Sequence, residues 1–446
     1  MGDQSVLVIG GGAAGLMAAR ELARVGAEVE LLEARNRLGG RIYTLPKITG
    51  GLPIELGAEF IHGSENEVWQ IVEEGKLRTH KVPDRHWRPG PGGLVKQKKF
   101  WDELEQVFSR LNPAAPDQDF RVFIDQAWSI NETAKKLALD YVEGFHAAPG
   151  DRMSVHALAK AEAAAEREHA TRAFRLADGY AAMVSLLEGE LETLGVRVFT
   201  ETAVRRLNWE PGLVEAVAQT ASGERPFRAC CAVVTLPLGV LQGEGPSALV
   251  FDPGLPGKER TIQGLAMGAV VKVTLQFRAR FWPNNNFGFI HSDDRWFRTW
   301  WSDPRGPVLT GWTGGPRAER LVHERKAVIL SFALQALAQT FKMDCDRIQE
   351  GLVASYYHDW SADEFSRGAY SYTPVGMGTM PHYLAAPVKS TLFFAGEATD
   401  TQGDQGTVHG ALRSGCRVAR EILDSRLNNL RFQSKTGEER RSKVVV

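Results

Sequence analysis

The sequence has 446 residues, 43% of them hydrophobic and 24% charged, which is the composition of a globular chain with a large core. Its 53 basic and 54 acidic residues give a formal net charge of -1, so charge gives no reason to expect a nucleic-acid partner. No apolar run approaches the roughly 18 residues that a membrane-spanning helix needs, and we find no secretory leader and no zinc-type cysteine spacing. We therefore expect a cytoplasmic protein of two or three domains without a metal site.

The first elements are predicted to be strand, helix and strand. Residues 6–9 are a continuous apolar run, which is typical of a parallel strand buried on both faces. The periodicity of residues 14–25 predicts a helix with one apolar stripe and with Arg20 and Arg24 on its outer face. Residues 28–32 complete a βαβ unit as the second strand.

The middle of the chain has a different character. Helical periodicity covers residues 133–145, 155–174 and 328–341. The segment 269–277 alternates like a strand, and Trp296 falls on another short strand candidate. This region is therefore expected to mix helices with short strands.

The chain closes on a strand over residues 392–395, a turn, and a helix from about 407 to 423. Because a βαβ opening and this closing unit bracket a different middle, we predict an α/β fold. A Rossmann-like domain built from discontinuous segments carries an inserted α+β substrate domain. The predicted boundaries are 1–79, 178–262 and 363–430 for the first domain, 80–177 and 263–362 for the second, and 431–446 for a flexible tail.

A glycine motif lies between the first strand and the first helix. Residues 10–15 match Gly-x-Gly-x-x-Gly, and Glu33 ends the next strand. In such a motif Gly10 allows the tight turn, Gly12 lets the backbone approach a pyrophosphate, and Gly15 lets the helix pack on the strand. The free N–H groups at the helix start bind phosphate, and Glu33 accepts from ribose hydroxyls. The motif therefore predicts a bound dinucleotide.

The loop after Glu33 favours FAD over a nicotinamide dinucleotide. Gly39 and Gly40 allow the chain to pass close to the cofactor, and Arg35 and Arg41 can neutralise phosphate charge. A nicotinamide enzyme has no evident need for this second cationic loop.

The string from Glu33 to Arg41 resembles the second FAD signature of the flavin amine oxidase family, which includes monoamine, polyamine and L-amino-acid oxidases and histone lysine demethylases. The likeness recurs from about Ser5 to Leu423. It is carried by segments 55–63, 233–241, 267–272, 360–370, 394–397 and 406–411. The resemblance implies the family's fold and an FAD cofactor.

The same resemblance implies three catalytic residues, Lys272, Tyr370 and His62. The strand pattern alone is compatible with an exposed Lys272, but the family places a lysine here that reaches flavin N5 through a water. A cation there favours electron acceptance and the reaction with oxygen. Tyr370 is implied to face the substrate space, with Trp360 near the isoalloxazine. His62 lies in an Ile-His-Gly string that some polyamine oxidases place near the substrate amine.

Two departures from the monoamine oxidase pattern narrow the predicted attachment of FAD and the predicted class of substrate. A flavin-linking cysteine is replaced here by Ala369, so non-covalent FAD is expected. A second cage tyrosine is replaced by Thr407, which leaves the aromatic wall incomplete, as in polyamine oxidases and lysine demethylases. The arginine with which L-amino-acid oxidases grip a carboxylate is not seen near His62. We predict a substrate pocket of Trp360, Thr407 and Phe60.

The cofactor site is predicted to draw on all these segments. The start of the closing helix directs partial positive charge at the flavin N1–C2=O edge, and Glu397 binds ribityl or ribose hydroxyls. The predicted FAD-binding residues are Gly10, Gly12, Ala14, Gly15, Glu33, Ala34, Arg35, Gly40, Arg41, Gly57, Ala58, Glu59, Phe60, Val204, Trp360, Gly396, Glu397, Gly406, Thr407 and Val408.

The expected reaction is oxidation of an amine C–N bond by hydride transfer to flavin N5. The imine hydrolyses to an aldehyde, and O2 reoxidises the flavin with release of hydrogen peroxide. A polyamine is the first choice of substrate, with acidic partners sought among Glu143, Glu162, Glu166 and Glu168. A monoamine or L-amino-acid oxidase is an alternative, and so is a non-catalytic FAD-containing scaffold. We expect no nucleic-acid or membrane partner and leave the oligomeric state open.

Overall fold

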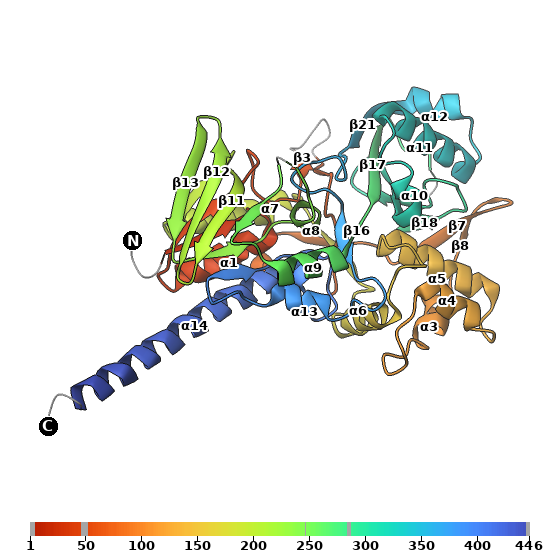
Figure 1. Ribbon diagram of the computed structural model, residues 1–446. Coiled ribbons are helices and arrows are strands. Elements are labelled where there is room, and N and C mark those ends of the chain that lie inside the picture. The colour runs from red at the N-terminus through yellow and green to blue at the C-terminus, as the bar shows by residue number, and fades with distance from the viewer. Residues whose placement is uncertain (1–4, 46–51, 246, 283–286, 443–446) are drawn as a thin grey trace.

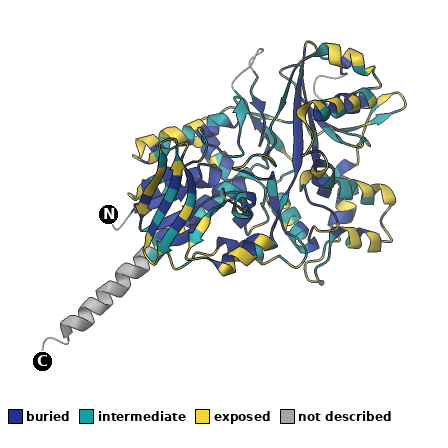
Figure 2. Cartoon of the chain, turned by 45° about the horizontal axis from the view of Figure 1, so that its top comes forward, coloured by how far each residue is buried: buried dark blue, intermediate teal, exposed yellow. Residues whose placement is uncertain are grey.

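The computed structural model describes residues 5–45, 52–245, 247–282 and 287–442, and side chains up to residue 425. Figure 1 shows two parts, one that contains helix α1 (Ala13–Arg24) and one that contains strand β17 (Val270–Phe277). The long helix α14 (Val408–Ser442) extends away from the first part. Buried residues follow the sheets of both parts, and exposed residues lie on the outer faces of the surrounding helices (Figure 2).

The first part is built on a parallel five-stranded sheet whose strands come from distant stretches of the chain. Its order is β10-β2-β1-β14-β23, and every neighbouring pair is parallel. Helices α1, α2, α7 and α14 pack on one face, and a four-stranded sheet of order β13-β12-β11-β15 packs on the other. The helix bounds are α1 (Ala13–Arg24), α2 (Glu67–Glu74), α7 (Ala181–Thr193) and α14 (Val408–Ser442). The strand bounds are β1 (Ser5–Ile9), β2 (Glu28–Leu32), β10 (Arg197–Phe199), β11 (Ala203–Glu210), β12 (Leu213–Thr220), β13 (Gly223–Ala229), β14 (Cys231–Val234), β15 (Val250–Asp252) and β23 (Leu392–Phe394).

The opening βαβ unit forms as predicted, with one correction. β1 is buried along its whole length, because other layers cover both faces of its sheet. The prediction that Arg20 lies on the outer face of the first helix is wrong, since its exposed fraction is only 2%. Its guanidinium pairs with Glu74 of α2 and, at 2.5 Å from Nε, with Glu190 of α7. These partners satisfy a charge that would otherwise be costly to bury.

The second part is a mixed seven-stranded sheet of order β21-β17-β20-β19-β18-β7-β8. Helix α11 packs its apolar side on one face of β17. The bounds around this sheet are β7 (His86–Gly90), β8 (Gly93–Lys96), β17 (Val270–Phe277), β18 (Phe289–His291), β19 (Thr299–Asp303), β20 (Val308–Gly314), β21 (Leu352–Tyr357), α10 (Gly315–Glu319), α11 (Lys326–Phe341) and α12 (Cys345–Gly351). A helical cluster beside it consists of α3 (Phe100–Phe108), α4 (Phe120–Gln126), α5 (Glu132–Phe145) and α6 (Val155–Arg167).

Three small sheets and a few short helices join the two parts. The sheets pair β3 (Thr44–Leu45) with β4 (Ile54–Glu55), β16 (Ala266–Gly268) with β22 (Tyr370–Tyr372), and β9 (Ala173–Leu176) with both β5 (Ile61–His62) and β6 (Thr79–Lys81). The short helices are α8 (Leu238–Leu241), α9 (Pro256–Gly264), α13 (Met380–Ala385) and the 3-10 turn η1 (Glu397–Thr399). Strands β5 and β22 therefore carry two of the predicted catalytic residues, His62 and Tyr370.

Four sequence predictions in the middle and at the end of the chain need correction or comment. The helix predicted to Phe174 ends at Arg167, because Phe174 pairs in strand β9 with Ile61. Trp296 lies in a loop rather than on a strand. α14 continues to Ser442, well past the predicted end near residue 423. Flexibility of 431–446 stays a prediction, since these side chains and residues 443–446 lie outside the description.

The architecture confirms the predicted α/β class, with a Rossmann-like sheet assembled from discontinuous segments. The exact domain boundaries stay predictions. Within the described ranges, no helix combines the length and the apolarity needed to cross a membrane.

Candidate active site

One cavity of about 1830 Å³ takes its walls from both parts of the molecule. Most small-ligand sites have about 300–1,000 Å³, so this cavity has room for a dinucleotide together with a second molecule. Every predicted site residue except Gly15 lies on its wall, including Lys272, Tyr370, His62, Trp360, Thr407 and Phe60. The structure thus brings these residues together, while their individual roles stay predictions.

The glycine motif forms one end of the cavity. Gly10 has a positive φ of 106°, which only glycine adopts readily, at the turn from β1. A Cβ at Gly15 would lie 1.9 Å from the carbonyl oxygen of Gly10, so α1 packs directly on the turn. At Gly12 a Cβ would meet nothing within 4 Å, because this residue faces the cavity.

These features fit the pyrophosphate of a dinucleotide. Gly12 is the N-cap of α1 and provides no side-chain cap, so the first N–H groups of the helix are available to an anion. Gly40 approaches Gly12 closely, since its Cβ would lie 3.2 Å from the Gly12 Cα. The loop after β2 therefore closes this cradle from the second side.

Glu33 lies at the end of β2 and is buried. Its carboxylate accepts hydrogen bonds from the N–H of Gly11 at 2.6 Å and of Arg35 at 2.8 Å. Burial raises the pKa of Glu33, and these hydrogen bonds only partly oppose the shift. Glu33 thus ties the glycine turn to the following loop, and binding of ribose hydroxyls stays its predicted role.

The two predicted phosphate partners are engaged by carboxylates. Arg35 makes a two-pronged contact with Asp363, at 2.8 and 2.7 Å. Burial would raise the pKa of Asp363, but His358 and Arg35 together lower it. Arg41 donates to Glu397 at 2.8 Å. Both arginines therefore connect the loop after β2 to distant segments, Arg35 to the one with Asp363 and Arg41 to the one with Glu397. Binding of the cofactor phosphates by these arginines stays a prediction.

Glu397 gathers several donors around the start of α14. Besides Arg41, it accepts hydrogen bonds from the Ser371 hydroxyl at 2.6 Å and from the N–H of Gly406 at 2.9 Å. These contacts hold β22, η1 and the turn before α14 together. Glu397 lines the cavity, so a hydroxyl-binding role stays compatible with its place.

Lys272 lies on the face of β17 that points away from α11 and toward the cavity. It is buried, its Nζ lies 2.7 Å from Glu59 Oε2, and it donates to the carbonyl oxygen of Gly57 at 3.0 Å. The exposed position that the strand pattern allowed does not occur, because both faces of β17 are covered. A buried ammonium with one carboxylate partner thus forms part of the wall.

Glu59 binds two cations. Besides Lys272, Arg175 lies 2.7 Å from its Oε1, and Trp301 donates to the same oxygen at 2.9 Å. Burial alone would raise the pKa of Glu59, but Lys272 and Arg175 outweigh it and lower the pKa. One carboxylate thus serves two buried basic side chains beside the cavity, and Arg175 also interacts with Asp303 and helps to lower the pKa of that carboxyl. Glu59, predicted as a cofactor contact, is therefore also the counter-ion of Lys272.

Aromatic side chains form the neighbouring walls. Trp360 donates from Nε1 to the carbonyl of Leu56 at 2.9 Å. The ring of Phe60 packs edge-on to Trp301, with centroids 5.3 Å apart. Tyr370 donates from Oη to the carbonyl of Phe145 at 2.6 Å, and burial, aided by Glu397, raises its pKa. This region offers an apolar space next to Lys272.

Residues 13–423 match the model of a family described as flavin containing amine oxidoreductase. The chain belongs to this family. That membership explains the cradle for a dinucleotide and makes FAD its cofactor.

Several relatives share most of this chain. It is 30% identical over 455 residues to lysine-specific histone demethylase 1 homolog 2 of Oryza sativa subsp. japonica, covering 95% of this chain but 58% of that protein. It is 29% identical to polyamine oxidase 2 of Arabidopsis thaliana, covering 94% of this chain and 87% of that protein. The chain thus spans little more than half the length of the demethylase homologue.

Solved structures of amine oxidases share the fold. A double mutant of putrescine oxidase superposes with a TM-score of 0.79 at 20% identity, covering 94% of this chain and 99% of that one. Cyclohexylamine oxidase from Brevibacterium oxydans IH-35A has a TM-score of 0.78 at 20% identity, covering 95% and 99%. At these identities the likeness establishes the fold of the flavin amine oxidoreductase and not its substrate.

Thr407 acts as a helix cap in this family member. Its hydroxyl accepts from the N–H of Gly410 at 2.9 Å and donates to the carbonyl of Asp404 at 2.7 Å. It caps the start of α14, which is the pattern that a Thr before a helix predicts. The same residue lines the cavity, so its predicted place at the pocket is compatible with the capping.

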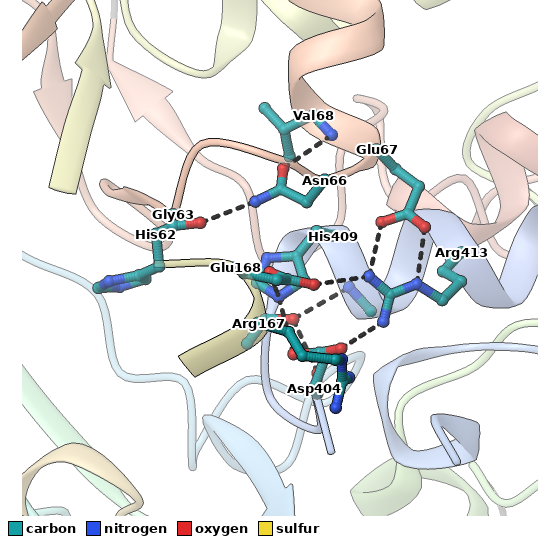
Figure 3. A network of polar contacts seen from close by, with 12 residues as sticks. His62, Gly63, Asn66, Glu67, Val68, Arg167, Glu168, Asp404, His409 and Arg413 are labelled. Atoms are coloured by element: carbon teal, nitrogen blue, oxygen red, sulfur yellow. Dashed lines mark hydrogen bonds and ion pairs between the residues drawn. The ribbon is translucent and has the colours of Figure 1, made fainter. Parts of the chain in front are cut away.

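A buried polar network fixes α14 beside His62 (Figure 3). Arg413 binds Glu67 at 2.6 Å, Glu168 at 2.8 Å and also Asp404, and His409 lies 3.2 Å from both Glu168 and Asp404. Glu168, Asp404 and His409 are close enough to share one metal ion, although Arg413 already binds both carboxylates. The sequence prediction of no metal site stays a prediction.

The acidic residues considered for a tunnel separate into two groups. Glu143 is buried at the end of α5 and pairs with Arg317 at 3.2 Å. Glu162, Glu166 and Glu168 line the cavity instead. Sequence reasoning missed the roles of Asp363, Arg175 and Ser371, because their partners lie far away in the chain and no local motif marks them.

The burial of His62 predicts how the free energy of unfolding changes with pH. Burial, and then the nearby His409, lowers the pKa of His62 to about 4. Its ordinary value is 6.5, so the folded protein binds fewer protons than the unfolded chain between these values. This group therefore reduces stability as the pH falls from about 6.5 towards 4. We expect His62→Gln to lose less unfolding free energy than wild type over that range in urea titrations. Parallel losses in the two proteins would refute the assignment.

Proposed function

We propose that this family member is an FAD-dependent amine oxidase that acts on a C–N bond of a small amine, with a polyamine as the favoured substrate. One observation carries the proposal: a buried ammonium, Lys272, and a wall of aromatic side chains share a single cavity with the dinucleotide cradle. FAD, when bound, supplies a two-electron acceptor that O2 can restore with formation of hydrogen peroxide.

The residues of the chain position the cofactor, exclude water from the substrate space and place a positive charge beside it. The glycine cradle and α1 bind the phosphates, which fixes the cofactor relative to the substrate space. Phe60, Trp360 and Tyr370 exclude water, so the neutral amine loses a hydride and a proton without competing solvent. The imine that forms is hydrolysed to an aldehyde and a shorter amine. Lys272 holds positive charge next to this space.

Ala369 supports non-covalent attachment of the cofactor. It lines the cavity directly before Tyr370 and offers no thiol for a bond to the flavin. A cytoplasmic location and small-molecule partners are part of the same proposal. The four cysteines, which form no disulfide, and the near-zero net charge support them.

Several features favour a polyamine over the alternatives. The plant relatives include proteins named polyamine oxidases, and Thr407 leaves the aromatic wall open. A carboxylate-binding arginine would favour an L-amino acid, but Arg175, whose guanidinium lies over the ring of Phe60, already binds Glu59. Demethylase homologues match at similar identity, so a methylated lysine side chain belongs in any substrate screen.

A peroxide-release screen of the purified yellow protein tests the substrate proposal. We expect peroxide with polyamines, and less with monoamines, L-amino acids or a dimethyl-lysine peptide. Peroxide from L-amino acids alone, or from the peptide alone, would contradict the choice of substrate. A protein that keeps FAD but gives no peroxide with any of them would favour the scaffold alternative.

A further inference from the structure

An aromatic corner lies at the end of α5, on the wall of the active-site cavity. The rings of Tyr141 and Phe145 stack with centroids 5.1 Å apart, and the ring of His146 packs edge-on to Phe145 at 5.2 Å. The Tyr141 and His146 rings are 5.9 Å apart. All three side chains line the cavity. We call this group the α5 corner.

A carboxylate and an unsatisfied nitrogen face each other at the α5 corner. Glu162 of α6 lies with Oε1 3.8 Å from His146 Nε2, which is beyond hydrogen-bond reach. Among the described residues His146 Nε2 is buried and has no hydrogen-bond partner. Most buried polar atoms in proteins have a hydrogen-bond partner, so this nitrogen can accept a hydrogen bond from a group that enters the corner. At this distance the Glu162 carboxylate and His146 Nε2 can both accept a hydrogen bond from a donor placed between them.

The end of α5 adds further negative character. This helix has 14 residues and ends at Phe145, with His146 as its C-cap. The C-terminal end of a helix carries a partial negative charge that favours cations. Burial raises the pKa of Tyr141, and Glu162 contributes to the shift, which keeps the phenol neutral beside the carboxylate. The corner thus combines ring faces, one carboxylate and a helix C-terminus.

The α5 corner adjoins the predicted reaction space. Tyr370 donates its hydroxyl to the carbonyl of Phe145 at 2.6 Å. The ring of His62 packs edge-on to Phe145, with centroids 5.5 Å apart. A molecule whose reactive carbon lies near Tyr370 and His62 can therefore extend a second group into the corner.

We propose that the α5 corner, formed by Tyr141, Phe145, His146 and Glu162, is a subsite for the second ammonium group of a diamine or polyamine substrate. An ammonium donates one hydrogen bond to Glu162 and another to His146 Nε2, while its charge faces the aromatic rings. A hard metal ion is disfavoured, because it seeks several oxygen ligands and the four described residues that define the corner include a single carboxylate, that of Glu162. This inference rests on the proposed function and names the part of the substrate that the corner selects.

The test compares diamines with monoamines of equal chain length. Butane-1,4-diamine and octane-1,8-diamine are titrated calorimetrically, alongside butan-1-amine and octan-1-amine, into FAD-loaded protein reduced beforehand without oxygen. The reduced cofactor accepts no further electrons, so binding is measured without turnover. We expect Glu162→Gln to weaken binding of at least one diamine about ten- to a hundredfold, the range for a lost charge-assisted hydrogen bond. Monoamine binding should change less than about threefold.

Glu166→Gln is the matched control. Glu166 lies one helical turn further along α6, also on the cavity wall, and its loss removes the same charge. An equal effect of the two substitutions, or equal weakening of diamines and monoamines by Glu162→Gln, would overturn the subsite. Unchanged diamine binding in Glu162→Gln would overturn it too. If the diamine preference depends on Glu162 but oxidised flavin is never bleached by amines, the subsite stands and the proposed oxidase function falls.

Discussion

Replacing Lys272 with methionine is expected to slow flavin reduction by amine, flavin reoxidation by O2, or both, by about 10²–10³-fold, as when a preorganised electrostatic contact is removed. Methionine keeps most of the length of the side chain and removes the charge. The positive charge on the cavity wall falls as a result, while Glu59 stays paired with Arg175. Stopped-flow absorbance of the flavin measures the two half-reactions separately.

Lys258→Met provides a matched control for this experiment. Lys258 is also a buried lysine, and its Nζ donates to the carbonyls of Tyr383 and Leu384 at 2.6 and 2.8 Å. It does not line the cavity. The control variant should lose stability but retain both flavin rates. Unchanged rates for both half-reactions in Lys272→Met would remove the proposed role of Lys272.

Two glycine substitutions should separate cofactor binding from folding. Gly12→Ala places a methyl group in open cavity space at a φ of -78°, which alanine adopts easily. We expect an apoprotein of unchanged stability whose FAD affinity falls about tenfold or more, a loss of at least about 1.4 kcal/mol of binding free energy. Gly15→Ala instead forces a Cβ to within 1.9 Å of a backbone oxygen, so the fold itself should lose about 1–3 kcal/mol.

Thermal unfolding of the apoproteins and FAD titration distinguish these outcomes. If Gly12→Ala binds FAD like wild type, the cradle at the start of α1 is not the phosphate site. If Gly12→Ala is instead destabilised as much as Gly15→Ala, the open space at Gly12 is misassigned.

Local patterns predicted the elements that a short stretch of chain determines. The apolar run of β1, the helix period of α1 and the turn at Gly10 each depend on neighbouring residues, and they form as expected. The closing helix also forms, although Thr407, predicted near its first residue, caps α14, which begins at Val408. The resemblance to a family then predicted which distant segments contribute to one site, and the structure places those segments on one cavity wall.

Long-range pairing could not be predicted in this way. Arg35 and Asp363 lie far apart in sequence, and so do Lys272 and Glu59, yet each pair is in direct contact. The local pattern likewise placed Arg20 on the outer face of α1, but helices α2 and α7 cover that position and supply its partners Glu74 and Glu190. Such contacts depend on how the elements pack, and no local motif encodes that packing.

Anaerobic addition of amine to the FAD-loaded protein tests the central claim most directly. We predict that a polyamine bleaches the absorbance of the oxidised flavin within the first turnover and that admitted O2 restores it. A flavin that stays yellow with every polyamine, monoamine, amino acid and methyl-lysine peptide would contradict amine oxidation by this protein.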